Sequence, residues 1–204
     1  MKRSKIILLI LYLIFYQCFI YFITKFTPFE FNILVSSIDS QLPFIPSFIY
    51  FYIIWYLMLF FVPFILYKYD ELNFNKYILT TFIGITVCGI IYFVFPTIIV
   101  RESIVVNNVT TFLIELIYKL DTPALNCLPS MHCLISFFFM IYCSLCKPLP
   151  IKYKFLINIF SILVVISTVL IKQHFIIDVI TALIISIIVS FIINKKIKTV
   201  FIKI

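Results

Sequence analysis

The segment "FLINIFSILVVISTVLIKQHFIIDVITALIISIIVSFII", residues 155–193, decides the fold of this 204-residue chain. It consists of two apolar runs, 155–171 and 175–193, separated by a short polar turn. A helix needs roughly 20 apolar residues to cross a hydrocarbon layer about 30 Å thick. Each run is close to that length, so the segment predicts two membrane-spanning helices joined by a turn at the membrane surface.

The rest of the chain has the same character, because 64% of all residues are hydrophobic and only 12% are charged. No soluble domain can bury that share of apolar side chains, so we expect an integral membrane protein. The polar and apolar alternation of a β-barrel is absent. We expect a single all-α domain over residues 1–204, a bundle of six transmembrane helices. The predicted spans are 6–23, 48–67, 77–95, 129–146, 155–171 and 175–193.

Basic residues indicate the orientation, because cytoplasmic loops carry an excess of Lys and Arg. With six spans, twelve of the 16 Lys and Arg residues, from Lys2 to Lys203, fall on the side of both termini. Both termini are therefore expected in the cytoplasm. The net charge of +8 is attributed to this bias and to anionic lipid headgroups, and a nucleic-acid partner is not expected. The opposite side carries Lys25, Arg101, Lys119 and Lys172.

The loop between the third and fourth spans contains an amphipathic stretch, "NVTTFLIELIYKL", residues 108–120. Its larger apolar residues recur at helical spacing, opposite to Thr110, Thr111, Glu115 and Lys119. We expect a helix lying in the extracytoplasmic interface, where it either covers the bundle or flanks a path for lipids.

Only two histidines occur, and both are expected at the extracytoplasmic ends of spans. His132 begins the span 129–146, and His174 lies in the turn before the last span, four residues ahead of Asp178. A carboxylate inside a membrane costs roughly 2.5–3.5 kcal/mol on insertion scales unless it is paired. If Asp178 accepts from one ring nitrogen of His174, the other nitrogen becomes a directed nucleophile. The alternative is a hydrogen bond that only joins two helices.

Three further groups are expected at the same membrane depth. Arg101 ends the third span, Lys172 lies two residues before a histidine, and Ser130 lies at a helix start, whose free N–H groups bind anions. Together they suit an anionic group in which a P–O bond breaks. Cations and amides would hold the oxygens, one histidine would attack phosphorus, and the other would protonate the departing oxygen. For the two cations, snorkelling to lipid headgroups stays an alternative.

These residues resemble the motifs of the type 2 phosphatidic acid phosphatase (PAP2) superfamily, which includes lipid phosphatases and inositol-phosphorylceramide synthases. The stretch PSMH, residues 129–132, resembles its second motif, commonly Pro-Ser-Gly-His. Ser167, His174 and Asp178 are similar to its third motif. Thr168 occupies the position of that motif's arginine.

The first motif of the superfamily is only partly present. Arg101 resembles the motif's arginine, but Glu102 replaces the following proline and Val94 replaces the preceding lysine. The segment "DSQLPFIPSFIYFYIIWY", residues 39–56, looks like the region before the second span in the branch that includes the inositol-phosphorylceramide synthases.

The resemblance implies a six-helix bundle whose site needs no metal and no cofactor. It gives His174 the role of a nucleophile that forms a phosphohistidine. It gives His132 the role of general acid and then base, and Asp178 that of orienting carboxylate. The phosphate-binding residues that it implies are Arg101, Lys172, Ser130 and Ser167.

The function expected is therefore a lipid phosphatase that hydrolyses a lipid phosphate monoester or a polyprenyl pyrophosphate. A transferase of phosphoryl headgroups using the same histidines is the alternative. Two other classes are a transporter in which the histidines and Asp178 relay protons, and a bis-histidine haem protein. The expected partners are the lipid substrate and membrane lipids, and the oligomeric state stays open. The many Ile, Phe, Asn and Lys residues indicate an AT-rich genome, so we expect a bacterial plasma membrane.

Overall fold

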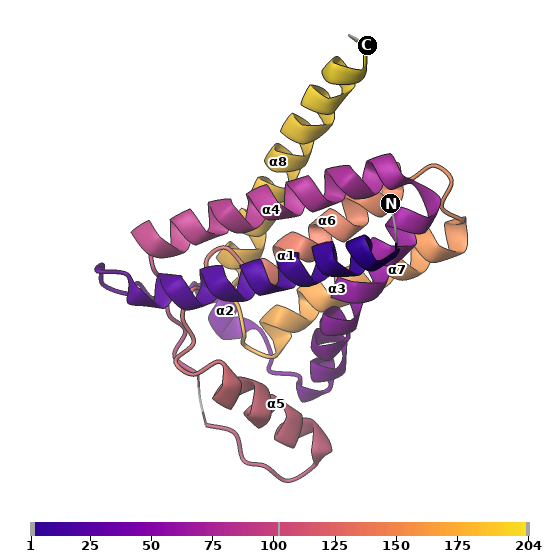
Figure 1. The fold of residues 1–204 in the computed structure, drawn as a ribbon. Coiled ribbons are helices and arrows are strands. Elements are labelled where there is room, and N and C mark those ends of the chain that lie inside the picture. The colour runs from indigo at the N-terminus through magenta and orange to yellow at the C-terminus, as the bar shows by residue number, and fades with distance from the viewer. Residues whose placement is uncertain (1–2, 102, 203–204) are drawn as a thin grey trace.

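The computed structural model describes residues 3–101 and 103–202, and within these ranges it consists of helices and loops without β-strands (Figure 1). The all-α class expected from the sequence is confirmed. Lys2, Glu102 and Lys203 lie outside these ranges. The bundle comprises α1 (Arg3–Ile23), α3 (Ile49–Tyr69), α4 (Glu71–Val94), α6 (Met131–Leu145), α7 (Ile151–Leu170) and α8 (Ile176–Ile202). The connecting segments form α2 (Ser37–Gln41), α5 (Val109–Leu120) and two 3-10 turns, η1 (Thr24–Phe26) and η2 (Pro46–Phe48).

Among the described residues, five helices are long and apolar enough to cross a membrane. The integral-membrane class is therefore supported, but the predicted count of six spans is not confirmed. They are Ile6–Phe26, Pro46–Tyr69, Glu71–Val94, Ile151–Leu170 and Ile176–Lys196.

The predicted span 129–146 forms the shorter helix α6, which has 15 residues. At about 1.5 Å per residue such a helix is about 22 Å long, less than a hydrocarbon core of about 30 Å. Burial inside the protein also accounts for its apolar run, because Leu134, Phe138 and Phe139 are fully buried among the surrounding helices. Burial in protein and burial in lipid select the same residue types, so composition alone could not separate the two.

Two glycines allow α4 to lie close to its neighbours. A Cβ atom on Gly84 would lie 2.7 Å from Cε2 of Phe138 in α6. A Cβ atom on Gly89 would lie 2.6 Å from Cγ2 of Ile20 in α1. Both distances are shorter than van der Waals contact, so a larger residue at either position would require Phe138, Ile20 or α4 to shift.

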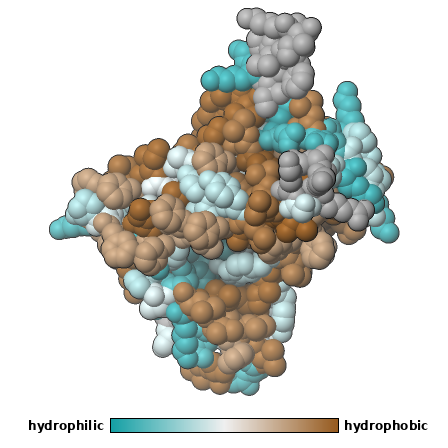
Figure 2. Space-filling view, viewed as in Figure 1, coloured by the Kyte–Doolittle hydropathy of each residue, from teal (hydrophilic) through white to brown (hydrophobic). Residues whose placement is uncertain are grey.

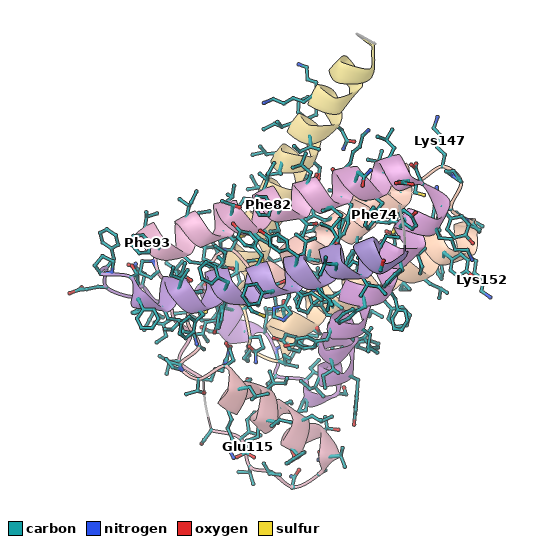
Figure 3. All side chains as sticks on the ribbon, in the orientation of Figure 1. Phe74, Phe82, Phe93, Glu115, Lys147 and Lys152 are labelled. Atoms are coloured by element: carbon teal, nitrogen blue, oxygen red, sulfur yellow. The ribbon has the colours of Figure 1, made fainter. Side chains whose placement is uncertain are left out.

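Apolar side chains cover most of the face seen in Figure 2, as expected where helices meet lipid. Lys147 and Lys152 extend outward at the end of the bundle away from α5 (Figure 3). Helix α5 coincides with the predicted amphipathic stretch, with Ile114 buried and Val109 and Phe112 exposed. Its position in a membrane interface stays a prediction.

Candidate active site

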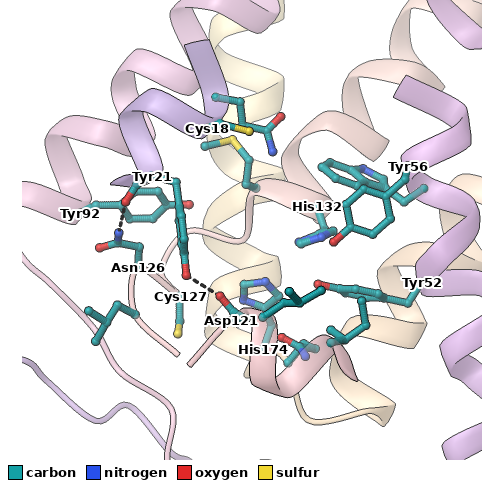
Figure 4. Close-up of a pocket in the computed structure, with 17 residues that line it drawn as sticks. Cys18, Tyr21, Tyr52, Tyr56, Tyr92, Asp121, Asn126, Cys127, His132 and His174 are labelled. Carbon is teal, nitrogen blue, oxygen red and sulfur yellow. Dashed lines mark hydrogen bonds between the residues drawn. The ribbon is translucent and has the colours of Figure 1, made fainter. Parts of the chain in front are cut away.

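A cavity of about 280 Å³ lies where α1, α3, α5 and the start of α6 meet (Figure 4). Both histidines line it, His132 from the first turn of α6 and His174 from the turn between α7 and α8. Their ring centroids are 5.8 Å apart. At that separation one phosphate group can contact both rings.

Asp178 lies directly behind His174. Its Oδ2 is 3.2 Å from Nδ1 of His174 and accepts the N–H of Phe175 at 2.9 Å. The carboxylate is almost completely buried, in the first turn of α8. With Nδ1–H donating to Asp178, Nε2 of His174 is left for the cavity. The Asp178 carbonyl also accepts the N–H of Ser130 at 3.2 Å, which joins the segments that carry the two histidines.

His132 is enclosed by aromatic side chains of α3. Its ring centroid lies 4.2 Å from that of Trp55 and 4.6 Å from that of Tyr52. Tyr56 approaches the same ring edge-on at 6.2 Å. These contacts fix the plane of the imidazole, because rotation of the ring would clash with its neighbours.

Arg101 reaches the cavity indirectly. Its Nη2 donates to Oδ2 of Asp121 at 2.5 Å and to Oε1 of Gln173 at 2.6 Å. Asp121 and Gln173 line the cavity, and Arg101 lies behind them over the ring of Tyr118. The carboxylate of Asp121 also accepts a hydrogen bond from Tyr21 (Figure 4). The positive charge of the guanidinium is therefore already paired with a carboxylate of the protein.

Lys172 supports the turn between α7 and α8 from outside the cavity. Its Nζ donates to the carbonyl oxygens of Asp39 at 3.0 Å and Leu42 at 2.7 Å. Asp39 in turn accepts the N–H of Ile176 through Oδ1 at 2.8 Å, at the start of α8. Burial raises the pKa of Asp39, but hydrogen bonds from Ser36 and from the Ile176 amide outweigh it and hold the pKa below its usual value. The loop that begins at Ser36 thus holds this turn in place.

Ser130 and Ser167 are fully buried, and their hydroxyl groups contact nearby backbone. Ser130 caps α6 by accepting the N–H of Cys133 at 3.3 Å, and Ser167 donates to the carbonyl of Val164 at 2.6 Å. Neither these serines nor Lys172 are among the residues that line the cavity. A direct contact with phosphate would require a change of conformation, because none of the three side chains reaches the cavity in this structure.

Several polar atoms in the cavity wall lack a hydrogen-bond partner among the described residues, although they are buried. Buried polar groups in folded proteins almost always have partners, and an unsatisfied one costs about 1–3 kcal/mol. Most of these atoms are nitrogens of residues that line the cavity, and each atom is itself enclosed by protein in this structure. They are Trp55 Nε1, His132 Nε2, Gln173 Nε2 and Asn126 Oδ1.

Reasoning from the sequence missed the aromatic wall, Asp121 and Gln173. A signal for the wall exists, because Tyr52, Trp55 and Tyr56 recur at helical spacing and Trp55 is the chain's one tryptophan. Asp121 and Gln173 are single polar residues in short connections, where no spacing pattern distinguishes them.

Fold and site define a class: an all-helical membrane protein in which two histidines and a buried carboxylate meet at one cavity. A protein-family model described as the PAP2 superfamily matches residues 77–201. The match covers more than half of the chain and includes both histidines, so the chain belongs to the PAP2 superfamily. Members of this superfamily are phosphatases and phosphotransferases. No curated protein and no solved structure matches the chain.

Proposed function

We propose that the chain is an integral-membrane lipid phosphatase of PAP2 type that hydrolyses a lipid phosphate monoester or a polyprenyl pyrophosphate. The observation that carries the proposal is the cavity shared by His132 and His174, with rings 5.8 Å apart. Asp178 behind His174 supports a nucleophilic role for that histidine. Membership of the PAP2 superfamily supports phosphoryl transfer as the type of chemistry.

In the first step, Nε2 of His174 attacks phosphorus and the P–O bond to the lipid breaks. Nδ1–H of the same ring donates to Asp178, which stabilises the positive charge that the ring acquires. His132 gives its proton to the departing oxygen, so the lipid alcohol leaves as a neutral molecule. The product of this step is a phosphohistidine at His174.

In the second step, His132 takes a proton from water, and the water oxygen attacks the phosphorus. The Nε2–P bond breaks, inorganic phosphate leaves, and His132 is again protonated. The faces of Trp55 and Tyr52 lie against this ring. The aromatic wall therefore holds the imidazole in one orientation for both proton transfers.

The nonbridging oxygens need donors, and we assign them to Arg101, the free amides at the start of α6 and the Gln173 amide. Arg101 donates hydrogen bonds to Asp121 and Gln173, which line the cavity. Gln173 Nε2 has no hydrogen-bond partner in the described part of the chain. Lys172 and Ser130 would contribute chiefly by holding the two segments that carry the histidines.

A second candidate is a transferase of the inositol-phosphorylceramide synthase type, with a lipid alcohol in place of water. The charge of the cavity favours it. Arg101 is paired with Asp121, and Lys172 is engaged by backbone carbonyls. A phosphodiester carries one negative charge and a monoester up to two, so a diester requires fewer free cations.

The proposal also places the cavity on the extracytoplasmic side of a bacterial plasma membrane, with both termini in the cytoplasm. Helix α6 separates His132 at its start from Lys147, which follows its other end. The basic turn between α6 and α7 and the cavity thus lie at opposite ends of one helix. The excess of Lys and Arg in cytoplasmic loops supports this orientation.

The test is phosphate release from phosphatidate and from a polyprenyl pyrophosphate by the purified protein in detergent with EDTA. Turnover should survive chelation, and His174→Ala should lose at least about a hundredfold, as expected when a covalent nucleophile is removed. A His174→Ala variant that matches the wild-type rate on every substrate overturns the proposal.

Two further experiments separate the two chemical steps and distinguish the phosphatase from the transferase. With a p-nitrophenyl ester, whose leaving group needs no proton, His132→Ala should form the phosphohistidine but hydrolyse it slowly. The trapped species should be labile to acid and stable to alkali. Adding diacylglycerol or ceramide to a phosphodiester substrate then decides between the candidates. A transferase yields a new phospholipid, whereas a monoester phosphatase leaves the diester unchanged and releases inorganic phosphate only from phosphatidate.

A further inference from the structure

A separate groove lies at the end of the bundle away from the histidines. It has a volume of about 800 Å³ and is formed by the start of α4, the end of α6 and the second half of α8. Figure 1 shows α8 diverging from α4 toward the C-terminal end of α8. His132 lies at the opposite end of α6, and the described residues that line the groove do not overlap with those that line the active-site cavity.

The wall that α8 contributes to the groove changes from polar to apolar with depth. Asn194, Ser190 and Ile187 all line the groove, and their spacing places them on one face of the helix. Ser190 lies about one turn deeper in the bundle than Asn194, and Ile187 about two turns deeper, roughly 10 Å at 1.5 Å per residue. The deeper part is also the more exposed, because the side chains of Ile187 and Phe191 are 55% and 66% exposed.

Two lysines line the same groove from the other helices, Lys76 in the second turn of α4 and Lys147 just after α6. The acidic residue among the lining residues is Asp70, whose carboxylate caps α4 by accepting the N–H of Asn73 at 2.9 Å. The side chain of Asn73 donates to the carbonyl of Tyr142 at 2.5 Å. The lining residues thus carry more positive than negative charge, next to neutral polar groups and an exposed apolar wall.

We propose that this groove binds an anionic phospholipid. Its phosphate lies between Lys76 and Lys147, its glycerol esters lie at the depth of Ser190, and an acyl chain lies against Phe191 and Ile187. A soluble phosphate leaves the exposed apolar wall uncovered, and an uncharged lipid does not use the lysines. The volume lies within the range of roughly 300–1,000 Å³ that is typical of small-molecule sites. The excess of lysines at this end favours the cytoplasmic leaflet, which is rich in anionic lipids. The proposal does not depend on the proposed phosphoryl transfer.

Native mass spectrometry of the purified full-length protein tests the role of the two lysines, with phosphatidylglycerol and phosphatidylcholine of equal chain length as probes. Lys76→Gln combined with Lys147→Gln should weaken the binding of phosphatidylglycerol about tenfold and that of phosphatidylcholine less than about twofold. The matched control combines Lys152→Gln with Lys154→Gln, two lysines at the start of α7 that do not line the groove. This control has the same net charge and should bind phosphatidylglycerol like the wild type.

Equal weakening in the two double variants would show only a general attraction to a basic surface and would overturn the site. Equal binding of both lipids to the wild type would overturn it as well.

A photoreactive residue tests the position of the lipid. p-Benzoylphenylalanine in place of Phe191 should form adducts in membranes that contain equal amounts of both lipids. The control places it at Phe155 of α7, which is similarly exposed at 63% and does not line the groove. The share of phosphatidylglycerol among the adducts should be at least about fivefold higher at position 191.

Three results of this experiment would overturn the proposal. The first is the same share of phosphatidylglycerol at both positions. The second is loss of the adducts at position 191 in excess glycerol phosphate, which would identify a site for soluble anions. The third is cross-linking between two copies of the chain in place of lipid adducts.

Discussion

Replacing Asp178 with asparagine tests how the site orients its nucleophile. Oδ2 of Asp178 accepts from Nδ1 of His174 at 3.2 Å and from the N–H of Phe175 at 2.9 Å, and the carboxylate itself is buried. Asp178→Asn keeps the shape but removes the charge and one of the acceptors. A hydrogen bond to a charged group contributes about 1.5–3 kcal/mol. At about 1.36 kcal/mol per tenfold change, kcat should fall roughly 10- to 150-fold.

The assay is the initial rate of phosphate release over a range of substrate concentrations. KM should change little, because Asp178 does not line the cavity. Asp70→Asn is the matched control: that carboxylate also caps a helix start, accepting the N–H of Asn73 at 2.9 Å, but at the start of α4. Asparagine caps helices about as well as aspartate, so this control should retain activity. Thermal unfolding of both variants separates a loss of catalysis from a loss of fold. An Asp178→Asn variant that folds normally and stays within about threefold of the wild-type kcat would refute the orienting role.

Two further predictions concern the charges around the site. Asp121→Asn removes the carboxylate paired with Arg101, so the KM for a dianionic monoester should fall several-fold relative to that for a diester. An unchanged ratio of the two KM values would show that the Asp121 carboxylate does not weaken the binding of a dianionic phosphate. Asp39 has a lowered pKa in the folded protein, so its stabilising contribution is present at neutral pH and is lost as the pH falls through that lowered value. The melting temperature of the wild type should therefore drop more steeply in acid than that of Asp39→Asn, and parallel curves would contradict the contacts of the loop that begins at Ser36.

The membrane helices could be predicted because hydrophobic length is a property of each segment alone. Helix α6 is the one predicted span that is not confirmed, because its apolar run is short and also fills the centre of the bundle. Its ends are set by neighbouring features, Ser130 as a cap on one side and Pro148 shortly after the other. A buried helix and a lipid-exposed helix use the same residue types. The number of spans therefore cannot be predicted from the sequence of each segment alone, because it depends on how the helices pack.

The turn between α7 and α8 shows why only part of the site could be predicted. His174 and Asp178 lie one helical turn apart, so their pairing follows from local geometry. Lys172 lies two residues from His174, and this proximity suggested a shared role at the phosphate. However, Lys172 has a φ of 56°, a left-handed conformation that costs roughly 1–2 kcal/mol in residues other than glycine, and no sequence rule assigns it to a lysine. Three consecutive polar residues thus have three different roles. Lys172 donates to backbone carbonyls of the loop that begins at Ser36, Gln173 accepts from Arg101, and His174 lines the cavity.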